Sequence, residues 1–183
     1  MRKSLPSALY GIAAEKGLID VNRTLEELAI DDQNPPLSSQ EKQARVVHRA
    51  QSCSGIYHDY VNPEGDLPDP GTHLPGTFFF YNSWSFNPLG TIFGKETELP
   101  IGEAFKRWIA DPIGMQDFDL KDVTYESSDE SIHAAYRFWI SARDLTRLGA
   151  LDLQEGRWNG QRIIPPDWAK GNVEPYSIPH RFG

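Results

Sequence analysis

Cysteine is nearly absent from this 183-residue sequence. Cys53 is the only one, which excludes an intrachain disulfide and a thiolate zinc cluster. Long apolar runs are missing as well, and no stretch approaches the roughly 20 residues that a membrane-spanning helix needs. Basic runs are absent and 18 Lys and Arg residues stand against 26 Asp and Glu, which argues against a nucleic-acid-binding surface. The sequence also lacks Gly-x-Ser-x-Gly, His-Glu-x-x-His and a phosphate-binding glycine-rich loop.

The composition that remains is that of an ordinary folded protein, with 39% hydrophobic and 24% charged residues. The length permits one domain with a sizeable core. The Gly- and Pro-rich residues 54–76 and the acidic residues 116–133 predict loops, and residues 136–140 predict a strand. Asn159-Gly160 predicts a turn before a strand-like segment. Apolar spacing and capping patterns predict helices over residues 4–16, 25–30, 40–51, 84–97, 101–109 and 142–155.

The most informative stretch covers residues 75–90. Pro75-Gly76 precedes three phenylalanines and Tyr81, and this pair predicts a turn because proline fixes φ and glycine permits unusual values. An apolar, helix-like segment follows. Tyr81 therefore lies at a junction between elements, where its side chain can face a cleft. The alternative is that Tyr81 packs among the phenylalanines, with its hydroxyl bonded to backbone.

This stretch, Pro-Gly-Thr-x-Phe-x-Tyr followed by a helix and Leu-Gly, resembles the second motif of the serine β-lactamase, penicillin-binding-protein and class C-like esterase superfamily. Four further stretches resemble other parts of that family, in family order and over nearly the whole chain. Residues 1–20 are similar to its nucleophile helix and the exit from that helix, and Ser52-Cys53-Ser54-Gly55-Ile56 is similar to its Thr-Ser-Gly turn. Asp111-Pro112-Ile113-Gly114-Met115 is similar to its Pro-Leu-Gly-Met turn. Ser141-Ala142-Arg143-Asp144-Leu145 with Leu148-Gly149 is similar to the helix opening that follows.

The resemblance implies a catalytic pair, Lys3 and Tyr81. The family's nucleophile motif is Ser-x-x-Lys, and Lys3 would find its serine one position before Met1, since neither Ser4 nor Ser7 has a lysine three residues later. Residues i and i+3 share a helix face, so the amine can reach the hydroxyl. In the family the tyrosine hydroxyl shuttles a proton, and the neighbouring lysine favours its ionised form. The alternative is that Lys3 is a surface lysine near a frayed terminus.

The family's third motif, Lys-Thr-Gly or His-x-Gly on an edge strand, is not found. Lys170-Gly171 and residues 180–183 have the wrong spacing. The strands that should precede the nucleophile and follow this region are missing too. The resemblance therefore implies an α+β, β-lactamase/transpeptidase-like fold, of which residues 1–183 are a single partial domain truncated at both ends. It would be the mainly helical part with a few short strands, most of the central antiparallel sheet would be missing, and residues 171–183 would form a loose tail.

The implied function is that of a serine hydrolase that forms an acyl-enzyme with an ester or amide substrate and uses no metal or organic cofactor. Penicillin-recognising members commonly have Tyr-x-Asn, whereas here the third place is Ser83, with Asn82 beside it. These two residues are the predicted substrate-binding positions, and the departure favours esters or simple amides over lactams. Without the nucleophile, the 183 residues alone are expected to show little or no turnover. A function of another class, a non-catalytic helical binding module, stays open.

The expected partner is a small-molecule ester or amide, with no nucleic acid and no membrane span, and exposed apolar faces permit self-association. His58, Asp59 and Asp69 match no metal-ligand spacing, so they are expected to be solvated loop residues. His48 is expected to be a surface or core residue of a helix.

Overall fold

The computed structural model describes residues 4–58 and 67–171, so Lys3, Asp59 and the predicted tail after Gly171 lie outside the described residues. The chain divides into two compact units, each built from separate stretches of sequence. Among the described residues, the first unit holds 4–19, 93–125 and 136–171, and the second holds 20–58, 67–92 and 126–135. That residues 1–183 form a single partial domain stays a prediction.

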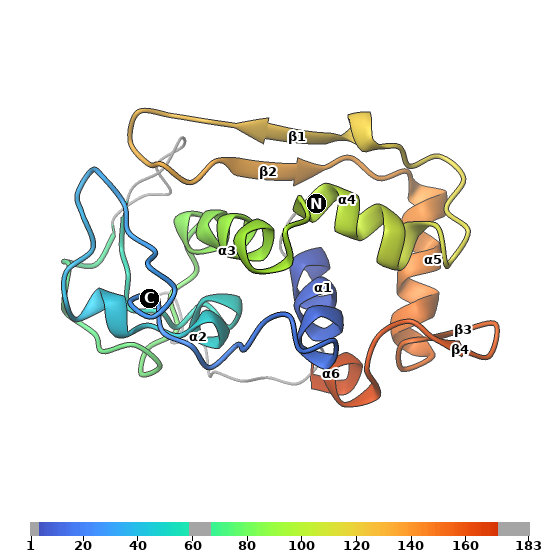
Figure 1. Cartoon of the computed structure of the whole chain (residues 1–183), viewed down its shortest axis with the longest axis horizontal. Coiled ribbons are helices and arrows are strands. Elements are labelled where there is room, and N and C mark those ends of the chain that lie inside the picture. Colours follow the sequence, from blue (N-terminus) through green and yellow to red (C-terminus); the bar gives the residue numbers. More distant parts are fainter. Residues whose placement is uncertain (1–3, 59–66, 172–183) are drawn as a thin grey trace, which may run out of the picture. The chain divides into compact units, whose positions relative to one another are not determined.

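Helices dominate the first unit (Figure 1). α1 (Ser4–Glu15) packs against α4 (Ile101–Phe105) and α6 (Pro166–Gly171). Helix α6 approaches α1 closely because Gly11 has no side chain, and a Cβ there would lie 2.4 Å from Trp168 Cγ. The unit also contains the π-helical turn η3 (Lys106–Ala110), α5 (Ala142–Leu153), and a hairpin of β3 (Arg157–Trp158) and β4 (Gln161–Arg162).

An aromatic cluster forms part of the core of the first unit. Phe105 meets the rings of Phe118 and Phe138 edge to face, with centroids 4.9 and 5.1 Å apart. All three side chains are buried. Burying such a side chain stabilises a fold by about 1.5–3 kcal/mol. This cluster therefore links α4 to the segments around residues 118 and 138, both of which precede α5.

The second unit is largely irregular. It contains the short helical turns η1 (Glu41–Gln43), α2 (Val46–Ala50) and η2 (Trp84–Phe86). η2 leads directly into α3 (Asn87–Thr97), whose first six residues belong to this unit and whose remainder belongs to the other. Trp84 is fully buried at the centre of the unit. Loops rather than regular elements therefore surround this core.

Strands are few in the part of the chain that the structure describes, which holds two sheets of two strands each. β1 (Val123–Glu126) follows the short turn η4 (Leu120–Asp122) and pairs with β2 (Ala135–Phe138). The two strands run in opposite directions in Figure 1. The hairpin β3–β4 turns at Asn159-Gly160, with φ values of 48° and 80°. Positive φ at both positions is what a two-residue type I′ turn requires.

Several sequence predictions are confirmed. The helix predicted over 4–16 is α1, that over 84–97 is η2 with α3, that over 101–109 is α4 with η3, and that over 142–155 is α5. Pro88 is the second residue of α3, where its missing N–H costs no helical hydrogen bond. α5 ends at Leu153, three residues before the predicted stop at Gly156, and Glu155 and Gly156 in the turn after it have φ values of 51° and 80°. Three further predictions are wrong.

Two of the predicted helices fail despite correct capping patterns. Thr24 and Glu27 exchange side-chain-to-backbone hydrogen bonds at 2.8 and 3.2 Å, yet Ala29 has a φ of 48° and residues 25–29 form turns. The helix predicted over 40–51 is interrupted at Ala44, whose ψ of 134° is extended. A capping box satisfies the first turn, but it does not commit the following residues to a helix. The loop predicted over 116–133 is also wrong, because β1 lies within it.

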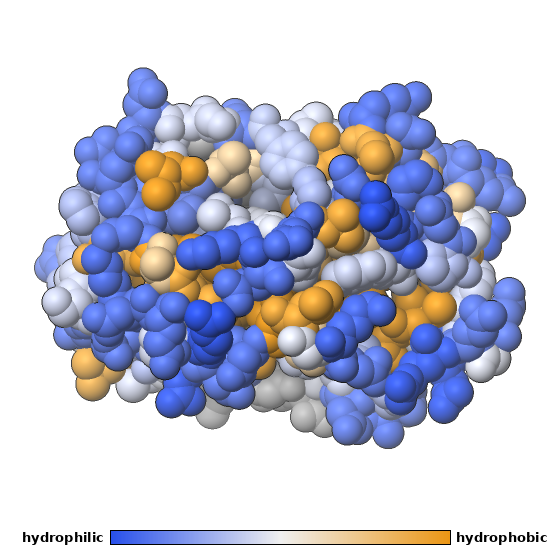
Figure 2. All heavy atoms as spheres, in the orientation of Figure 1, coloured by the Kyte–Doolittle hydropathy of each residue, from blue (hydrophilic) through white to orange (hydrophobic). Residues whose placement is uncertain are grey.

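Figure 2 shows one face of the molecule, on which hydrophilic side chains surround separate apolar patches. The exposed large hydrophobic residues include Leu74, Trp139 and Leu153, with 60, 62 and 89% of their surface exposed. Self-association through such faces stays a prediction. Within the described chain, no helix combines the length and the apolarity needed to cross a membrane.

Candidate active site around Tyr81

The predicted Pro-Gly turn is present before the aromatic run. Thr77 N–H donates to Leu74 O at 3.2 Å and Gly76 has a φ of 86°, as expected for a type II turn with proline second and glycine third. The following residues are joined to the turn at residues 52–56, called here the 52–56 turn. Gly76 N–H donates to Cys53 O at 2.7 Å and Phe80 N–H donates to Ser52 O at 2.8 Å. The backbone before Tyr81 is thus fixed to a segment about 25 residues earlier.

The glycine of the 52–56 turn is needed for this close approach. Gly55 has a φ of 70°, and a Cβ at this position would lie 2.6 Å from the carbonyl oxygen of His73. An L-residue side chain would therefore suffer both backbone strain and a clash with backbone. This gives a physical reason for glycine in the stretch that resembles a Thr-Ser-Gly turn.

Tyr81 lies at the surface of the second unit, three residues before the start of η2. Its side chain keeps 47% of its surface exposed, and its ring centroid lies 6.0 Å from that of Phe86. The aromatic run therefore does not enclose the phenol. Lys3 lies outside the described residues, so the pairing of Lys3 with Tyr81 stays a prediction.

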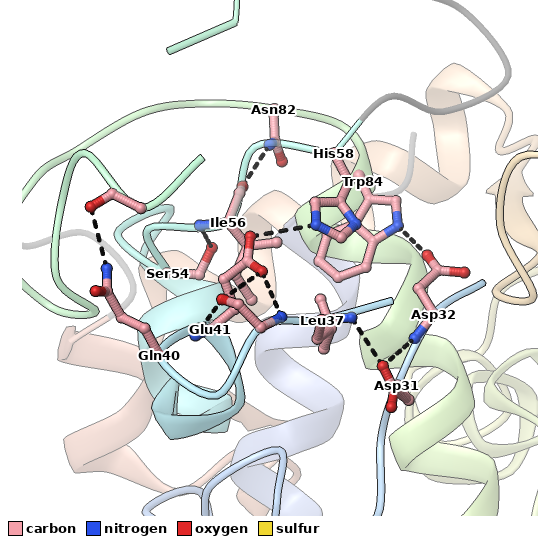
Figure 3. A network of polar contacts seen from close by, with 12 residues as sticks. Asp31, Asp32, Leu37, Gln40, Glu41, Ser54, Ile56, His58, Asn82 and Trp84 are labelled. Atoms are coloured by element: carbon pink, nitrogen blue, oxygen red, sulfur yellow. Dashed lines mark hydrogen bonds and ion pairs between the residues drawn. The ribbon is translucent and has the colours of Figure 1, made fainter. Parts of the chain in front are cut away.

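The two predicted substrate-binding residues are both buried, with 2% of Asn82 and 3% of Ser83 exposed. Asn82 Nδ2 donates to Ile56 O at 2.9 Å (Figure 3). Asn82 Oδ1 accepts from Ser85 N–H at 2.8 Å. The second bond is that of a helix N-cap. Sequence reasoning missed this role, although Asn82 stands at an N-cap position ahead of a predicted helix.

A buried polar network surrounds Trp84 (Figure 3). The indole Nε1 donates to Asp32 Oδ2 at 2.6 Å, and the Arg49 guanidinium lies 4.4 Å from the indole ring centre. Asp32 also accepts from Ser131 Oγ at 2.7 Å and from Ile132 N–H at 2.9 Å. Burial disfavours the Asp32 carboxylate, but these hydrogen bonds outweigh burial and hold its pKa below the ordinary value. The network therefore joins loops that are about 100 residues apart.

His58 corrects one prediction, because it is not a solvated loop residue. Only 4% of it is exposed, its ring lies 4.9 Å from that of Trp84, and its Nε2 lies 3.2 Å from Glu41 Oε1. Burial disfavours the Glu41 carboxylate, but the contact with His58 and the bonds from Ser38 outweigh burial, so the pKa of Glu41 is lowered. Sequence reasoning gave no sign of this pair, because 17 residues separate its members. His48, as expected, lies in α2 and is partly buried.

Tyr81 offers an exposed phenol on a firmly bonded backbone, and the described residues contain no group of three metal-ligating side chains. Such a phenol can take up or release a proton when a neighbouring cation lowers its pKa. The buried acids of the same unit, Asp32 and Glu41, are bound by donors of the surrounding loops and of Trp84 and His58, which suits a structural role.

Comparisons with known proteins agree with this picture of the fold. Neither a protein-family model nor a curated protein matches the sequence. Among solved structures, a candidate 6-aminohexanoate-dimer hydrolase from Bacillus anthracis superimposes with a TM-score of 0.68 at 21% identity, over 93% of this chain and 50% of its own. A candidate β-lactamase from Bacteroides dorei DSM 17855 reaches 0.66 at 15% identity, over 98% and 58%. An octameric penicillin-binding-protein homologue from Pyrococcus abyssi reaches 0.66 at 18% identity, over 97% and 48%.

The chain spans about half the length of these solved proteins. These superpositions establish a common fold. Sequence identities of 15 to 21% are too low to establish a common activity. The mixed architecture expected from the sequence, mainly helical with short strands, is confirmed. The chain has the β-lactamase and penicillin-binding-protein fold, of which it covers about half.

Proposed function

We propose that the protein to which this chain belongs is a serine hydrolase that works through an acyl-enzyme. The observation that carries the proposal is Tyr81, an exposed phenol on a fixed backbone at the start of a helix, within a fold shared with β-lactamase and penicillin-binding-protein structures. The matching order of the five sequence stretches supports the same conclusion.

In the proposed reaction, the serine of Ser-x-x-Lys attacks an ester or amide carbonyl. Lys3 and Tyr81 together take the proton of this serine as the carbon–oxygen bond forms, and they pass a proton to the leaving group as its bond to the acyl carbon breaks. Water then attacks the acyl-enzyme, and the serine regains its proton. The nucleophile would stand one position before Met1 in the longer protein. These 183 residues alone are proposed to have little or no turnover.

The proposed substrate is an ester or a simple amide. Asn82 directs both ends of its amide to Ile56 O and Ser85 N–H, and Ser83 is buried beside it. These residues therefore leave no side-chain amide next to Tyr81 that could hold the acylamino group of a lactam. The neighbour named for hydrolysis of the 6-aminohexanoate dimer supports the amide class, whereas others are named for β-lactams or penicillin.

A p-nitrophenyl ester assay on the longer protein tests the proposal. Replacing the serine before residue 1 by alanine should abolish turnover, and Tyr81→Phe should lower kcat/KM by about 10²-fold, the usual range for a lost acid–base group. Tyr125→Phe is a matched control, because Tyr125 is exposed to a similar extent, at 54%. Equal activity in the wild type and both site variants would overturn the proposal and favour the non-catalytic binding module.

A further inference from the structure

We propose that Asn82 is a positioning residue, which fixes the Tyr81 phenol by fastening the chain after it to the 52–56 turn. This inference rests on the proposed role of Tyr81. Asn82 is adjacent to Tyr81, yet the two residues have opposite environments, because 47% of Tyr81 and only 2% of Asn82 is exposed. An adjacent buried side chain can hold the backbone while the exposed one stays available for chemistry.

The backbone is fixed on both sides of Tyr81. Before it, Phe80 N–H donates to Ser52 O at 2.8 Å, and after it, Asn82 Nδ2 donates to Ile56 O at 2.9 Å. Both acceptors belong to the 52–56 turn. A residue held at both neighbours has few conformations open to its own φ and ψ, so its side chain leaves the surface in one direction.

Asn82 has a second bond that fixes the elements after Tyr81. Its Oδ1 accepts from Ser85 N–H at 2.8 Å, which caps the helical stretch formed by η2 and α3. Phe86, whose ring lies 6.0 Å from that of Tyr81, belongs to η2. One amide therefore joins the 52–56 turn, Tyr81 and the helix whose phenylalanine lies beside the tyrosine ring.

The side chain of asparagine suits this position because it donates and accepts at the same time. Aspartate could still accept from Ser85 N–H, but it has no donor for Ile56 O and would place a buried charge against that carbonyl. Serine could cap Ser85 N–H but is too short to make both bonds. Asn82→Asp and Asn82→Ser therefore remove the bond to Ile56 and retain the cap.

The test labels the 183-residue chain with 3-fluorotyrosine and records ¹⁹F spectra, with Tyr81→Phe identifying the Tyr81 signal. Both Asn82 variants should move or broaden this signal and speed exchange of the Phe80 amide hydrogen by about tenfold or more, at temperatures where circular dichroism shows a folded chain. Ile92→Val, which trims the buried core of α3, is the control and should leave the Tyr81 signal unchanged.

The proposal is overturned if both Asn82 variants keep the wild-type Tyr81 signal and Phe80 exchange, or if Ile92→Val changes them equally. If Asn82→Asp fails to fold, Asn82→Ser alone decides between these outcomes. In the longer protein, Asn82→Ser should lower kcat for the ester about tenfold with little change in KM. The spectra need no catalysis, so a wild-type protein without ester hydrolysis would refute the proposed function and leave the positioning result standing.

Discussion

Asp144 allows a quantitative test of the first unit. This carboxylate is fully buried at the start of α5 and accepts three backbone hydrogen bonds, from Gln116 at 3.0 Å, Asp117 at 2.9 Å and Phe118 at 3.0 Å. The first bond ends on Oδ1 and the other two on Oδ2. Asp144 therefore fixes the loop that follows the turn at residues 111–115 to the first turn of α5.

Asp144→Asn should cost about 3–5 kcal/mol of unfolding free energy. Asparagine has one acceptor oxygen, which can keep the two bonds of Oδ2 while its NH₂ group faces the third backbone N–H. One lost bond with an unsatisfied donor costs about 2–3 kcal/mol, and two bonds weakened by the loss of charge add roughly 0.5–1 kcal/mol each. This is a large share of the roughly 5–15 kcal/mol that stabilises a domain.

Urea unfolding followed by tryptophan fluorescence and circular dichroism measures this loss. Asp152→Asn is the matched control, because it makes the same chemical change on an exposed position of the same helix. It should change the unfolding free energy by less than about 0.5 kcal/mol. The reasoning would be refuted by a loss below about 1 kcal/mol for Asp144→Asn, or by equal losses in the two variants.

Three further predictions concern the second unit. Gly55→Ala should cost at least about 1 kcal/mol more than Gly71→Ala in urea unfolding, because both glycines have positive φ but only Gly55 has backbone within 4 Å of the added carbon. Burial lowers the pKa of His133 in the folded state, so stability should decrease as pH falls below about 6.5, and His133→Gln should flatten that part of the urea-midpoint profile. The lowered pKa of Asp32 stabilises the fold above about pH 4 and this contribution disappears as the carboxylate is protonated, so Asp32→Asn should reduce stability at pH 7 and make acid unfolding shallower.

Much of the local structure could be predicted because its signals lie within a few residues of each other. The type I′ turn at Asn159-Gly160 and the Pro75-Gly76 turn both depend on φ preferences that the residue types reveal. The stretch Val123-Thr124-Tyr125 carried a strand signal of β-branched and aromatic residues, which the surrounding acidic residues concealed. The composition of a segment is therefore a weaker guide to its secondary structure than the residue type at each position.

The helix opening at Ser141 shows where local reasoning stops. Ser141 Oγ accepts from Asp144 N–H at 3.2 Å, as a capping box predicts. The Asp144 carboxylate makes no return bond in this box, because it binds the backbone of residues 116–118 instead. The competing donors lie 26 to 28 residues away in the chain, so sequence spacing could not reveal them. This stretch is one of those that resemble the family, and the structure shows what its aspartate does: it holds the backbone of residues 116–118.

The same limit applies to the candidate site, and it explains why Tyr81 and Asn82 were both predicted to be functional residues. Spacing places Tyr81 and Asn82 together at a junction, but their directions depend on a partner 26 residues earlier, the Ile56 carbonyl. The amide of Asn82 turns inward to that carbonyl, while the preceding Tyr81 keeps 47% of its surface exposed. The opposite environments of these two neighbours therefore depend on a contact between distant segments, which sequence spacing cannot reveal.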